Sequence, residues 1–89
     1  MIARLRGTII QIDDNMVMID VAGVGYAATV SGKTQAGLII GGGEVTLLTD
    51  MVVREDSMTL FGFIDTAERD AFRLLVTVQG VGAKAAMAI

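Results

Sequence analysis

The chain has 89 residues, of which 53% are hydrophobic, and it contains no cysteine and no histidine. These absences exclude disulfides and thiolate zinc sites, and they remove the commonest metal ligand and general base. Seven basic against ten acidic residues give a net charge of −3, opposite in sign to the footprint of most proteins that bind duplex DNA. A domain this small is marginal alone, so the apolar content predicts either a well-filled core or a surface covered by partner subunits.

Up to residue 64, segments rich in Val, Ile, Thr and Met alternate with short Gly, Asp and Asn clusters. This spacing is typical of an all-β barrel or sandwich. We expect tight turns at Asp13-Asp14-Asn15 and Ala22-Gly23, and an irregular connection over residues 31–43. The expected strands are 3–12, 16–21, 25–30, 44–53 and 58–63. Five strands with a longer connection before the fourth predict a five-stranded Greek-key barrel of OB type, residues 1–64.

Two short matches to nucleotide-binding motifs fail on their context. Residues 23–28, GVGYAA, fit the dinucleotide fingerprint, but no helix fits after them where a βαβ unit requires one. Gly32-Lys33-Thr34 resembles the end of a P-loop, but the required earlier glycine falls on Ala27. We therefore expect no cofactor and no ATPase activity.

The segment between the fourth and fifth expected strands places Arg54, Glu55, Asp56 and Ser57 at a hairpin tip. Its simplest interpretation is a solvated polar turn. Paired carboxylates can serve acid–base catalysis, but adjacent residues rarely converge on one substrate atom, and nothing nearby supplies a nucleophile or a metal set. We expect no enzymatic activity from this segment.

The pattern changes after residue 63. Asp65 and Glu68 have the spacing of a capping box, which marks a helix N-terminus. Apolar residues then recur at helical spacing and predict a helix to about residue 78. A second helix begins at Ala83 and reaches only about two turns, too few to be stable alone. We expect the chain to continue, so that residues 65–89 begin a truncated helix-hairpin-helix domain.

The link between these helices, Gly80-Val81-Gly82-Ala83-Lys84, carries the strongest functional signal. The glycines let the backbone approach another molecule without a Cβ in the way. The helix that follows leaves its first N–H groups unpaired, and its dipole favours an anion. This pattern resembles the phosphate site of helix-hairpin-helix DNA-binding proteins. A helix C-cap followed by an ordinary connection is the alternative.

No run approaches the roughly 18 apolar residues of a membrane span. The apolar stretch after Arg6 is broken at Gly7, Gln11 and Asp13, unlike that of a signal peptide. We expect a cytoplasmic protein with no membrane partner.

Five motifs occur in an order and spacing that resemble the bacterial RuvA family: residues 1–7 (MIARLRG), 23–26 (GVGY), 52–56 (VVRED), 60–63 (LFGF) and 80–84 (GVGAK). RuvA is the Holliday-junction-binding subunit of a branch-migration machine in recombination and DNA repair. Asp50 departs from the family pattern, where a basic residue or histidine is usual, and Phe61 replaces a common tyrosine. The connection over residues 33–43 is also atypical, and the family's second helix-hairpin-helix and C-terminal domain are not in the chain.

The resemblance implies a tetramer with four-fold symmetry, or an octamer, built on the barrel and presenting one face to an opened four-way junction. Residues 80–84 would hold phosphates of the arms, and Glu55 and Asp56 would be acidic pins at the junction centre. Implied partners are junction DNA, the RuvB ATPase (through the C-terminal domain) and the RuvC resolvase, within the SOS response. The chain itself would catalyse nothing. The alternative, from another class, is an acidic OB-like protein-assembly module without DNA binding.

Overall fold

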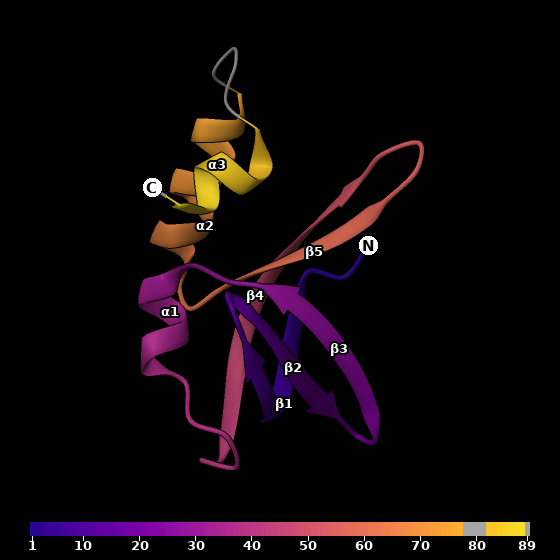
Figure 1. Ribbon diagram of the computed structural model, residues 1–89, viewed down its shortest axis with the longest axis vertical. Helices are drawn as coiled ribbons and strands as arrows, with labels where there is room; N and C mark the ends of the chain where they lie inside the picture. The colour runs from indigo at the N-terminus through magenta and orange to yellow at the C-terminus, as the bar shows by residue number, and fades with distance from the viewer. Residues whose placement is uncertain (78–81, 89) are drawn as a thin grey trace.

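The computed structural model describes residues 1–77 and 82–88 and contains a closed five-stranded barrel (Figure 1). The strands are β1 (Arg4–Asp13), β2 (Met16–Val21), β3 (Val24–Thr29), β4 (Glu44–Val53) and β5 (Met58–Phe63). Their order around the barrel is β1-β2-β3-β5-β4, and β4 pairs again with β1 to close it. Only β3 and β5 run parallel among these pairs. The structure confirms the predicted OB-type barrel, and each strand end lies within one residue of the predicted position.

The barrel interior is filled by alternate side chains, since successive strand residues point to opposite faces of a sheet. Ile9 of β1, Val17 and Ile19 of β2, and Leu47 of β4 have no exposed surface. Leu38, which lies outside the strands, is 8% exposed and belongs to the same apolar cluster. This core joins all sides of the barrel.

Two tight turns connect the first three strands. Asp14 and Asn15 have φ angles of 36° and 68°, and Ala22 and Gly23 have φ angles of 52° and 92°. Two successive residues with positive φ match the turn that joins antiparallel strands with a right-handed twist. Both predicted turns are therefore confirmed.

Closure of the barrel depends on β1, because this strand pairs with β2 along one edge and with β4 along the other. A register shift between Ile9 and Gln11 interrupts its pairing with β2, and such irregularities bend a strand. Gly7 lies in β1 beside the backbone of β2. A Cβ added there would stand 2.0 Å from the Asp20 carbonyl oxygen, so only glycine fits.

The prediction of an irregular connection over residues 31–43 is wrong in its first half. Helix α1 (Gly32–Gly37) occupies it, and the Ser31 side chain caps the helix by accepting a hydrogen bond from the Thr34 N–H at 3.1 Å. Glycine at both ends lowers the helix propensity of this segment and obscures it in the sequence. The N-cap serine and the burial of Leu38 against the barrel stabilise the helix nonetheless.

Helix α2 (Thr66–Val76) begins where the capping signal predicts it. The Asp65 carboxylate accepts a hydrogen bond from the Glu68 N–H at 2.8 Å. In a capping box the side chain at the third helical position accepts a hydrogen bond from the N–H of the N-cap residue. Here Glu68 accepts instead from the N–H of Ile64, one residue earlier, at 3.1 Å. Helix α3 (Ala83–Ala88) begins at the predicted residue, whereas the expected end of α2 near residue 78 lies outside the described residues. Within residues 1–77 and 82–88, no helix is both long and apolar enough to cross a membrane.

A second apolar cluster joins the two helices to the outside of the barrel. Phe72 of α2 lies between Phe61 and Phe63 of β5, with both ring centroids 5.0 Å from its own. Ala86 and Met87 of α3 complete the buried part of this cluster. The helices therefore pack on the strand that also forms one side of the β4–β5 hairpin.

Gly7→Ala should lower the free energy of unfolding by about 1–3 kcal/mol, the usual cost of overpacking, because its Cβ would meet the β2 backbone. Gly37→Ala is the matched control, since no described heavy atom lies within 4 Å of the added Cβ. Urea unfolding of both variants measures the difference. A Gly7→Ala protein as stable as the parent would contradict the close approach of β1 to β2.

Candidate nucleic-acid interface

The β4–β5 hairpin extends beyond the barrel and ends in a tight turn (Figure 1). The Arg54 N–H donates to the Ser57 carbonyl oxygen at 2.8 Å and closes the turn around Glu55 and Asp56. Both acidic residues are exposed, and no ion pair in the described part of the chain includes either carboxylate. The tip therefore presents two adjacent negative charges to solvent, an arrangement that repels phosphate.

A hollow of about 370 Å³ separates the stem of this hairpin from the start of α3. Arg54 and Ser57 line one side, and Gly82 and Ala83 line the other. At Gly82 no described heavy atom lies within 4 Å of the place a Cβ would occupy, so the backbone is accessible from the hollow. A guanidinium, a hydroxyl and an open stretch of backbone suit a phosphodiester better than a base edge.

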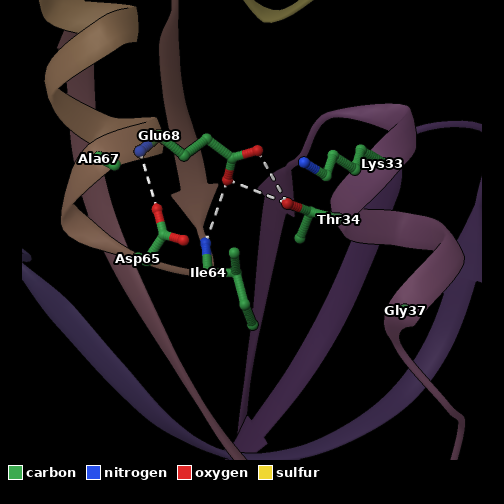
Figure 2. Close-up of a pocket in the computed structure, with 7 residues that line it drawn as sticks. All are labelled: Lys33, Thr34, Gly37, Ile64, Asp65, Ala67 and Glu68. Carbon is green, nitrogen blue, oxygen red and sulfur yellow. Dashed lines mark hydrogen bonds between the residues drawn. The ribbon is translucent and has the colours of Figure 1, made fainter.

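The position of α2 relative to the barrel is set partly by the Glu68 carboxylate. It accepts hydrogen bonds from the hydroxyl of Ser31 at 2.7 Å and from that of Thr34, which lies 2.9 Å from both carboxylate oxygens. A third bond comes from the Ile64 N–H (Figure 2). Glu68 and Thr34 line a pocket together with Lys33. One side chain thus joins α1, the end of β5 and α2.

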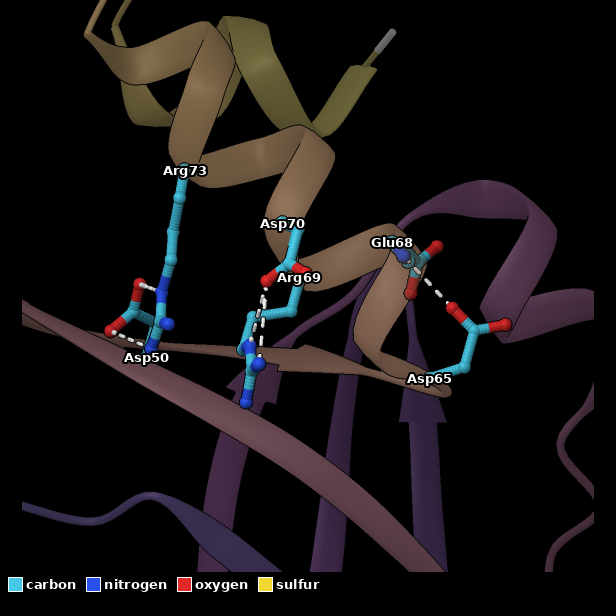
Figure 3. A network of polar contacts seen from close by, with 6 residues as sticks. All are labelled: Asp50, Asp65, Glu68, Arg69, Asp70 and Arg73. Atoms are coloured by element: carbon cyan, nitrogen blue, oxygen red, sulfur yellow. Dashed lines mark hydrogen bonds and ion pairs between the residues drawn. The ribbon is translucent and has the colours of Figure 1, made fainter.

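A second polar contact joins α2 to the barrel on another strand. The Arg73 guanidinium donates to the Asp50 carboxylate of β4, with Nε 3.1 Å from Oδ2 (Figure 3). The hydrogen bond to Asp50 and the negative charge of Asp50 raise the pKa of Arg73. The neighbouring pair of Arg69 and Asp70, at 3.3 Å, lies within α2 and makes no such link.

The family model described as RuvA N terminal domain matches residues 1–62, which include the barrel strands except the last residue of β5. The chain belongs to this family. The "Holliday junction branch migration complex subunit RuvA" of Acidiphilium cryptum is 56% identical over 87 residues, which are 98% of this chain and 43% of that relative.

Other relatives with the same name are similarly close. The protein of Paramagnetospirillum magneticum is 52% identical over the whole chain and 42% of its own length, and that of Nocardia farcinica is 51% identical over the whole chain and 44% of its own length. The RuvA-family chain thus spans less than half the length of the curated relatives it matches.

The structure brings some of the predicted site residues near one another. Glu55 and Asp56 lie at the hairpin tip, as predicted, and Gly82 and Ala83 lie across the hollow from the hairpin stem. Lys84 is the second residue of α3, as expected for the first helical turn. Gly80 and Val81 lie outside the described residues. Within residues 1–77 and 82–88, no three acidic side chains gather as a metal site would require.

Several residues of this region were not predicted from the sequence. Arg54 was identified only as part of a polar turn, yet it lines the hollow. The contacts of Glu68 with Ser31 and Thr34 depend on α1, a helix that no local sequence pattern predicts. The available signal was Ser31 itself, since serine is a preferred N-cap residue.

Proposed function

We propose that this chain binds four-way DNA junctions by their structure, as the DNA-recognition part of a branch-migration complex in recombination and repair. The observation that carries the proposal is the arrangement of two opposite features at one end of the molecule. An acidic tip at Glu55 and Asp56 lies beside a hollow lined by Arg54 and by the backbone at Gly82. Family membership and the names of the curated relatives support the same function.

The two features would act on different parts of a junction. Residues 80–84 would hold phosphates of a duplex arm through backbone N–H groups and the Lys84 charge, without reading bases. Glu55 and Asp56 would stand at the centre, where their charges keep the exchanging strands apart. Attraction at the arms with repulsion at the centre would explain how a chain of net charge −3 selects a junction over a simple duplex.

Assembly would multiply these contacts. We propose a tetramer, or an octamer of two tetramers, built on residues 1–64, with residues 65–89 as the start of the helix-hairpin-helix domain. Among residues 1–77 and 82–88, ten large apolar side chains are exposed, Ile39 and Ile40 among them at 70% and 57%, and subunit contacts would cover part of this surface. The chain would be non-catalytic and cytoplasmic, with RuvB hydrolysing ATP and RuvC cutting the junction.

A gel-shift comparison at one stated salt concentration tests the function directly. The chain should bind a four-way junction at least about tenfold more tightly than a linear duplex of the same length. A chimera that carries this chain in place of the matching part of the Acidiphilium cryptum relative serves as the longer form. Equal or absent binding by both proteins would instead support a protein-assembly module without DNA binding.

Glu55→Gln combined with Asp56→Asn should remove a repulsion and no attractive contact. Junction affinity should hold or increase, while duplex affinity increases more, so that selectivity falls. The difference from the parent should be largest in dilute buffer, because screening shortens to about 8 Å near physiological ionic strength. A loss of junction affinity in this variant would show that the carboxylates are structural or bridge a cation.

Gly82→Val should weaken junction binding more than Lys84→Ala, because a branched side chain would occupy the place where the phosphate approaches. No described heavy atom lies within 4 Å of the added Cβ, so the first atom of the new side chain meets no described part of the protein. Lys84→Ala should reduce affinity about equally for junctions of all DNA sequences. It should also lower by about one the slope of log affinity against log salt concentration. Unchanged affinity in a folded Gly82→Val protein, verified by circular dichroism, would remove this segment from the interface.

A further inference from the structure

Helix α2 is attached to the barrel by contacts of two kinds. Phe72 is 3% exposed and packs between two phenyl rings of β5. Burial of these rings stabilises the contact strongly, although the hydrophobic driving force itself sets no direction. Hydrogen bonds constrain direction as well as distance. The polar contacts on either side of Phe72 therefore add directional constraints on how the helix is oriented on the barrel.

These polar contacts reach two different parts of the barrel. Glu68, near the start of α2, is bound by hydroxyls of Ser31 and Thr34 at α1, and Thr34 is itself only 5% exposed. Arg73 reaches Asp50 on β4, whose side chain is 18% exposed. The two residues are five positions apart, which corresponds to about 7.5 Å along a helix axis. Two separated attachment points fix both the rotation and the tilt of a helix, whereas one would leave a pivot.

We propose that Glu68 and Arg73 are positioning residues that hold α2, and with it the start of α3, at a set orientation to the acidic β4–β5 hairpin. Helix α3 packs on α2 through the shared cluster around Phe72, so it follows the orientation of α2. The spacing between Gly82 and the hairpin stem then depends on the contacts of Glu68 and Arg73. The consequence for junction binding rests on the proposed function, but the orientation itself does not.

The absence of native cysteine allows the orientation to be measured by spin labelling. Gln11→Cys on β1 and Leu74→Cys on α2 place nitroxides at two exposed positions. Labelled chain diluted with unlabelled chain gives the distance distribution within one molecule by pulsed electron paramagnetic resonance. Glu68→Ala combined with Arg73→Ala should widen this distribution at least about twofold, because packed helices slide when their interface is loosened.

The matched control is Arg69→Ala combined with Asp70→Ala, which also removes one base and one acid from α2 but only a contact within the helix. It should keep the parent distribution. An unchanged width in the Glu68→Ala/Arg73→Ala protein, or equal widening in the control, would overturn the proposal. Asp50→Arg with Arg73→Asp reverses the second ion pair and should restore the narrow distribution that Arg73→Asp alone loses. Failure of this restoration would overturn the role of Arg73. This test applies even if the Glu68→Ala/Arg73→Ala protein does not fold.

Junction binding by the same proteins separates the proposal from the proposed function. The Glu68→Ala/Arg73→Ala chain should bind a four-way junction roughly tenfold more weakly than the control, since the two features would no longer be held at a set spacing. If the parent chain shows no preference for junctions, the proposed function fails. The distance distributions still show whether Glu68 and Arg73 hold the orientation of α2. A widened distance distribution without loss of junction affinity would show that the orientation of α2 does not affect binding. That result would overturn the expected effect on junction binding.

Discussion

The packing of Phe72 between Phe61 and Phe63 is the interaction on which the arrangement of this molecule depends. These two rings belong to β5, which is at once a barrel strand, one side of the acidic hairpin and the surface on which the helices pack. Aromatic rings bury large areas and prefer tilted contacts of this kind. Because one strand serves all three purposes, the hairpin and the helices share one structural base.

An acidic chain is an unusual candidate for binding DNA, and the distribution of its charge resolves the difficulty. All of the net charge lies in residues 1–62, whereas residues 63–89 carry three basic and three acidic side chains. In the proposed function the acidity belongs to the part that excludes strands, and the balanced part holds phosphates by geometry. Net charge then predicts solubility and the steering of a partner, and local geometry decides which nucleic acid is bound.

The barrel could be predicted from the sequence because its signals are local. Turn residues such as Asp14-Asn15 and alternation along each strand mark the elements within a few positions, and the Asp65 cap does the same for α2. Helix α1 was missed, because Gly32 and Gly37 weaken its propensity while the contacts that stabilise it come from distant residues. The same reason hid the roles of Glu68 and Asp50. Their partners lie 37 and 23 positions away, a separation that no local pattern encodes.

The pairing of β1 with β4 has a consequence for how the chain reaches its fold. Gly7 lies opposite Val45, so one side of the barrel consists of residues that are far apart in the sequence. Contacts between distant residues form only when a long loop closes. The entropy cost of that closure slows folding relative to helical proteins of equal size. On the ribosome, β1, β2 and β3 can form their hairpins early but cannot close. The nascent chain therefore lacks the strands that complete the barrel around the apolar face of β1, β2 and β3 until β4 and β5 have left the exit tunnel.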